Sequence, residues 1–108
     1  MTPRPQYSQH RADGNQAEII SALEKAGATV FRIGQPLDLL VGFRGTNYLL
    51  EVKQPGAKLR ETQEDFLRFW TGQASVVHTT REALEVIGAV KSEWKNLSVG
   101  NVKRRAAQ

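Results

Sequence analysis

Residues 37–53 read LDLLVGFRGTNYLLEVK, and this stretch decides the fold. It holds two apolar runs, 37–43 and 47–53, joined at Arg44-Gly45-Thr46. A short connection containing glycine between two such runs is typical of a β-hairpin. Both runs are apolar at consecutive positions, which predicts strands that are buried on both faces in the middle of a sheet.

Charged residues lie at the ends of these apolar runs. Alternate residues of a strand share a face, so Glu51 and Lys53 are expected on the same side of the sheet. Pairing in the hairpin brings the start of the first run beside the end of the second, which places Asp38 near both. Charges at buried strand ends are costly unless something uses them. The sequence therefore predicts that three charges meet at one rim of the hairpin.

Composition sets the outer limits. The chain has 108 residues, a net charge of +4 and a pI near 9.8, which predicts one compact domain whose charge permits nucleic-acid binding without demonstrating it. The absence of cysteine excludes disulfides and thiolate metal sites, so a metal site would use oxygen ligands, which favour Mg²⁺ or Mn²⁺. No apolar run reaches the roughly 20 residues of a membrane span and no signal-peptide pattern occurs, so we expect a soluble, cytoplasmic protein.

The remaining elements are predicted along the chain from their periodicity. They are a helix over 15–27 that Asn15 caps, a strand over 28–33, the two hairpin strands, a helix over 59–70, a strand over 74–79 and a short helix over 81–88. This α-β-β-β-α-β-α order predicts an α/β domain with a small mixed sheet flanked by helices. We expect a flexible N-terminal arm over 1–14 and a basic C-terminal tail over 89–108.

The rim of charges indicates a particular chemistry. Two carboxylates as close as Asp38 and Glu51 repel each other unless a divalent cation lies between them. Mg²⁺ suits hard oxygen ligands and keeps waters that a phosphate oxygen can replace. Lys53 could orient and help deprotonate an attacking water, or offset charge in the transition state. The pattern favours a metal-dependent phosphodiesterase, and its alternative is an ordinary surface salt bridge.

The motifs resemble those of a known family. PLDLLVG at 36–42 and YLLEVK at 48–53 resemble the PD-(D/E)XK nuclease superfamily. More narrowly, R-x-D-x-N-x-x-E from Arg11, GATV at 27–30 and a later helix carrying glutamine resemble a stand-alone, phage-type VRR-NUC domain, which is similar to Holliday-junction resolvases. The resemblance covers 11–88 and implies a restriction-endonuclease-like fold, a nuclease domain over 15–88 and a homodimer that acts on branched DNA.

The resemblance also implies roles for individual residues. Asp38 and Glu51 would be metal ligands, Val52 would contribute its backbone carbonyl, and Lys53 would be the catalytic lysine. Glu18 matches the acid of the family's first helix and would bind the metal directly or through water. The alternative for Glu18 is a solvated helix carboxylate.

Gln63 lies on the helix face that Phe66 and Leu67 are expected to bury, so its amide needs a partner. In the resembled family, a glutamine here holds the lysine or the scissile phosphate, whereas the alternative is an amide satisfied by backbone. The family's usual Ser/Thr-Pro opening is missing before this helix. Thr62 could cap it instead, which would start the helix later.

Arg11, Arg44, Lys58 and Arg60 flank the expected site in loops and are candidate DNA contacts, although solvated surface charge is the alternative for each. Trp70 is expected in the core or an interface. We therefore expect a Mg²⁺-dependent endonuclease, with Mn²⁺ as a substitute. The competing hypothesis is a non-catalytic module of the same fold that binds DNA or protein, and a restriction or repair nickase is a third possibility.

Overall fold

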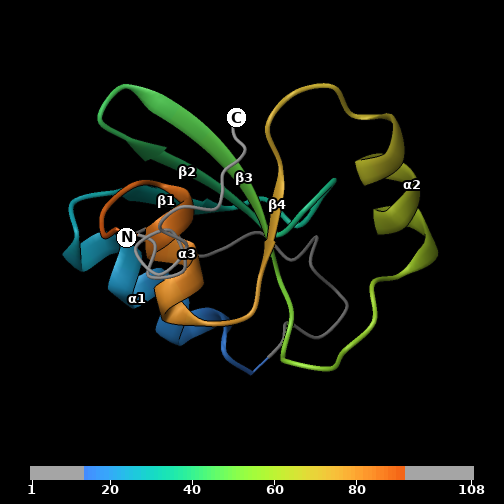
Figure 1. Ribbon diagram of the computed structural model, residues 1–108, viewed down its shortest axis with the longest axis horizontal. Coiled ribbons are helices and arrows are strands. Elements are labelled where there is room, and N and C mark those ends of the chain that lie inside the picture. The colour runs from blue at the N-terminus through green and yellow to red at the C-terminus, as the bar shows by residue number, and fades with distance from the viewer. Residues whose placement is uncertain (1–13, 92–108) are drawn as a thin grey trace, which may run out of the picture.

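The computed structural model describes residues 14–91 (Figure 1). Its elements are α1 (Gln16–Lys25), β1 (Thr29–Arg32), β2 (Leu39–Phe43), β3 (Thr46–Val52), α2 (Glu61–Phe69), β4 (Ser75–Val77) and α3 (Thr80–Val86). The predicted order of helices and strands is confirmed. Most of the expected N-terminal arm, with Arg11, and most of the basic tail lie outside the described residues.

The four strands form one mixed sheet in the order β1-β2-β3-β4, with β1, β2 and β3 antiparallel and β3 parallel to β4. The predicted α/β class and hairpin are therefore confirmed. Arg44 and Gly45 turn the hairpin with φ values of 52° and 82°, and Thr46 already pairs with Phe43. Two successive positive φ values match the right-handed twist of the strands, and glycine adopts them without a steric cost.

The hydrophobic core lies between one face of the sheet and the helices α1 and α3 (Figure 1). Alternate residues of each strand point to this face. The largest core side chains with almost no exposed surface are Ile19, Leu23, Leu39, Val41, Leu50, Val52 and Val77. Alternate strand residues and one face of each helix thus pack into a single apolar layer. A shift of the hairpin register by one residue would turn the strand residues out of this layer, so the layer fixes the register.

The opposite face of the sheet is less covered than predicted. The register places Phe31, Leu40 and Leu49 in one row across β1, β2 and β3. Phe31 is 61% exposed and Leu40 is 38% exposed. The prediction that both hairpin strands are buried on both faces is wrong for β2 and for the first half of β3, because α2 lies beyond β4, apart from α1 and α3 (Figure 1).

The helix α2 differs from its prediction at both ends. It begins at Glu61 with Arg60 as the N-cap residue, so the late start with Thr62 as cap is wrong. It ends at Phe69, and Trp70 is extended and 45% exposed, stacked on Phe66 with ring centroids 5.0 Å apart. Trp70 therefore does not lie in the core of the described domain.

The helix α1 begins where predicted, but the Asn15 side chain does not cap it. Its Nδ2 instead donates to the carbonyl oxygens of His78 and Lys53, at 2.8 and 3.3 Å. Asn15 thus ties the start of α1 to the ends of β3 and β4. Within 14–91, every helix is too short or too polar to cross a bilayer.

Candidate metal and phosphodiester site

The two predicted carboxylates meet on the sheet face that points away from the core. Leu39 pairs with Leu50, so the next residues outward, Asp38 and Glu51, are neighbours at the start of β2 and the end of β3. Both are buried, and Glu51 is only 1% exposed. The Asp38 Oδ2 accepts a hydrogen bond from the Val52 backbone N–H at 2.9 Å. This contact fixes one carboxylate against the strand that carries the other.

Glu51 is the electrostatic centre of the site. Its Oε2 accepts a hydrogen bond of 2.6 Å from Gln63 Nε2 and lies 4.0 Å from Lys53 Nζ. Burial, then the negative charge of Asp38, and also a hydrogen bond between the two carboxyl groups raise the pKa of Glu51 from 4.5 to about 7, against the opposing effects of Lys53 and Gln63. The neighbouring carboxylate thus makes ionisation of Glu51 unfavourable without a cation.

The other oxygen of Glu51 has no partner. Oε1 is buried, and no hydrogen-bond donor reaches it within 14–91. A buried acceptor without a donor is costly, and a carboxylate oxygen is a preferred ligand of hard divalent cations. A proton on Glu51 can join the two carboxyl groups by a hydrogen bond, and a divalent cation between the orphaned oxygen and Asp38 could take the place of that proton.

Lys53 is held at the rim by its backbone. Its N–H donates to the Val77 carbonyl oxygen at 3.0 Å, and its carbonyl oxygen accepts from Asn15 Nδ2. Only 12% of its side-chain surface is exposed. Glu51 is therefore seen beside both Asp38 and Lys53, as the sequence predicts.

Gln63 is the single buried residue of α2, and both ends of its amide are engaged. Nε2 donates to Glu51, while Oε1 accepts the Arg60 backbone N–H at 2.9 Å. This second contact is half of a capping box, in which the third helical residue reaches back to the N-cap backbone. Gln63 therefore contacts the acid rather than Lys53, and it couples the start of α2 to the site.

Glu18 is not brought to the carboxylates. It is exposed on the first turn of α1, which packs against the core face of the sheet. No group of three or more His, Asp or Glu side chains with metal-binding spacing occurs in 14–91. Val52 contributes a contact through its N–H, and the ligand role of its carbonyl stays a prediction. The geometry thus offers two side-chain ligands, Asp38 and Glu51.

The candidate DNA contacts separate in space. Arg44 lies in the hairpin turn, with its guanidinium 4.6 Å from the Phe43 ring centroid, at the end of β2 opposite to Asp38. The expectation that Arg44 flanks the site is wrong, because a hairpin turn is at the far end of its strands. Lys58 is exposed in the loop before α2, and Arg60 lines a pocket next to Gln63.

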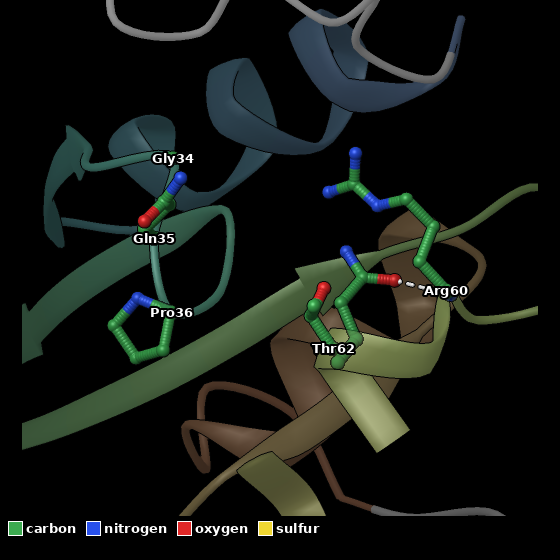
Figure 2. Close-up of a pocket in the computed structure, with 6 residues that line it drawn as sticks. Gly34, Gln35, Pro36, Arg60 and Thr62 are labelled. Atoms are coloured by element: carbon green, nitrogen blue, oxygen red, sulfur yellow. Dashed lines mark hydrogen bonds between the residues drawn. The ribbon is translucent and has the colours of Figure 1, made fainter. Parts of the chain in front are cut away.

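That pocket was not predicted from the sequence. It has a volume of about 310 Å³ and is lined by Gly34, Gln35, Pro36, Arg60, Thr62 and Gln63 (Figure 2). Of the residues that line the pocket, Pro36 was noted in the sequence, but only as part of the motif that contains Asp38 and not as part of a pocket.

Comparisons of the chain with protein-family models, with curated proteins and with solved structures give no match.

Proposed function

We propose that this protein is a metal-dependent DNA endonuclease with its reaction centre at Asp38 and Glu51. The observation that carries the proposal is the buried Glu51 carboxylate with an orphaned Oε1, beside Asp38 and Lys53 on one rim of the sheet. The lysine and the glutamine amide both contact Oε2 and leave Oε1 to the neighbouring carboxyl group, where either a shared proton or a divalent cation relieves the repulsion between the two acids.

Each residue of the site has a proposed role that follows from its position. Asp38 and Glu51 would hold Mg²⁺ or Mn²⁺, and the bound ion supplies Lewis-acid activation of a water and of the phosphoryl group. Gln63 fixes the orientation of Glu51 through its 2.6 Å hydrogen bond. Lys53 places a positive charge 4.0 Å from Glu51 Oε2, where it would orient the nucleophile or offset charge that develops on the phosphate.

The fold and substrate parts of the proposal rest on the sequence resemblance. A mixed sheet with an antiparallel hairpin, followed by a helix and a parallel strand, is compatible with a restriction-endonuclease-like fold. We propose branched DNA as the substrate. Paired cuts across a junction need two reaction centres, so we also propose a homodimer, which light scattering tests directly.

A second candidate is a non-catalytic module that binds DNA or protein. It is favoured by one observation, the exposed position of Glu18 away from the two carboxylates. With two side-chain ligands, such a module would bind cations weakly and would not cleave. The two candidates differ in whether phosphodiester bonds are hydrolysed.

The test is a cleavage assay with the purified chain. A four-way junction, a flap, a linear duplex and single strands are each incubated with Mg²⁺, Mn²⁺ or EDTA. We expect cleavage with either cation, no cleavage in EDTA, and loss of cleavage in Lys53→Ala. Arg81→Ala is the matched control, because Arg81 pairs with Glu85 on α3. Cleavage that survives both EDTA and Lys53→Ala would contradict the mechanism, and its absence on every substrate would favour the binding module.

A further inference from the structure

Hydrogen bonds link the two walls of the pocket beside Gln63 to Asp38 and to Glu51. One wall is the loop 34–36, which is closed by the Asp38 carbonyl oxygen accepting from Ile33 N–H and Gly34 N–H at 2.9 and 3.2 Å. The loop is therefore attached directly to the backbone of the residue that carries one carboxylate.

The other wall is the start of α2. Gln63 belongs to this wall and donates to Glu51 Oε2, while its own Oε1 holds the backbone of Arg60. A group that enters the pocket is thus held at a fixed place relative to Asp38 and Glu51. This is the requirement for a substrate subsite rather than for an unrelated surface hollow.

The lining has the chemistry of a nucleotide site. Arg60 and Thr62 come from one wall, and the Pro36 ring comes from the other (Figure 2). A guanidinium and a hydroxyl bind phosphate oxygens, whereas a proline ring offers an apolar surface to a base. A volume of about 310 Å³ is at the lower limit of small-molecule sites, which suits one nucleotide rather than a longer segment.

We propose that this pocket receives one unstacked nucleotide of the DNA strand next to the phosphodiester that is cut. The inference rests on the proposed function, because that function defines which phosphodiester next to the pocket is cut. It narrows the proposed substrate to DNA that has an unpaired nucleotide. A base inside an intact duplex is stacked and cannot enter, so entry requires a bulge, a flap or a junction. The pocket thereby selects for DNA structure without reading a long sequence.

The first arm of the test does not depend on cleavage. ¹⁵N-labelled protein is titrated in EDTA with a deoxynucleoside 5′-monophosphate or with inorganic phosphate, and amide shifts are followed by NMR. We expect the nucleotide to shift the amides of 34, 35 and 60–63. Arg60→Gln and Thr62→Val should each weaken binding about tenfold, the cost of one hydrogen bond to a charged group. Arg68→Gln should leave it unchanged, because Arg68 pairs with Asp65 outside the pocket.

The second arm compares a duplex carrying one bulged nucleotide with the fully paired duplex, in Mg²⁺. We expect the bulged duplex to be cut faster, and the pocket variants to remove that preference. Equal shifts with inorganic phosphate, shifts that avoid the pocket, or equal cutting of both duplexes would each overturn the inference. If neither duplex is cut, and the four-way junction and the flap are not cut either, but the nucleotide still binds in the pocket, the proposed function fails while the pocket assignment holds.

Discussion

Glu51→Gln should make the metal-free protein more stable above neutral pH. The replacement has nearly the same shape. Its amide oxygen can accept from Gln63 Nε2, and its amide nitrogen can donate to the Asp38 carboxylate, which the native side chain repels. The variant therefore removes a buried charge and keeps the hydrogen bond, so it should fold to the same structure.

The magnitude follows from the pKa of Glu51. Its value is about 7 in the folded protein, against an ordinary 4.5. Between these two pH values the folded state keeps a proton that the unfolded state has released, so the free energy of unfolding falls as pH rises. One pKa unit corresponds to about 1.4 kcal/mol, so the full loss is roughly 3 kcal/mol once pH exceeds the folded-state pKa.

Urea unfolding in EDTA, at pH values from 4.5 to 8, measures this effect. We expect the two proteins to have similar unfolding free energies near pH 4.5, and the variant to be more stable by roughly 3 kcal/mol at pH 8. Mg²⁺ should restore the stability of the native protein at pH 8 and leave the variant unaffected, because only the native site has both carboxylates. A difference that does not change with pH, or that favours the native protein as pH rises, would refute the reasoning.

Three further changes test separate parts of the structure. Lys53→Met should lower the cleavage rate by about 100-fold or more while Mn²⁺ still binds, since the lysine acts on the reaction rather than on the cation; unchanged cleavage would remove its proposed role. Gln63→Leu should cost about 2 kcal/mol in urea unfolding and raise the pKa of Glu51 further, because the acid loses its hydrogen-bond donor. A lowered pKa in an NMR titration would contradict that role. Leu23→Ala should cost 2 to 5 kcal/mol, roughly, because Leu23 is fully buried in the core; a loss below 1 kcal/mol would contradict the packing described.

The hairpin and its carboxylates could be predicted because their determinants are local. The two-residue period of a strand and the glycine turn predict that the start of one strand lies beside the end of the other, but the turn is one residue shorter than the predicted Arg44-Gly45-Thr46 connection, and only the observed register sets Asp38 opposite Glu51. The order of helices and strands follows from periodicity in the same way. For Gln63, its place on a helix face showed that the amide needed a partner, but not that the partner is Glu51.

What the sequence did not predict depends on how elements pack. A consecutive apolar run favours a strand that is covered on both faces, but whether a helix actually covers the second face depends on packing, so the exposure of Leu40 was missed. Whether Glu18 faces solvent or the carboxylates depends on how α1 packs on the sheet. The apolar period of the helix does not specify that packing, so it could not decide between the two positions. The pocket joins residues 34–36 to residues 60–63, which only the fold brings together.

The central claim is that Asp38 and Glu51 form a divalent-cation site. Anomalous diffraction from a crystal grown with Mn²⁺ tests it most directly, with a Glu51→Gln crystal as the control. We predict an anomalous peak in contact with Asp38 and with Glu51 Oε1, the buried oxygen that has no donor among residues 14–91. The peak should be absent from the variant. A saturating Mn²⁺ concentration that leaves no peak between the two carboxylates would contradict the claim.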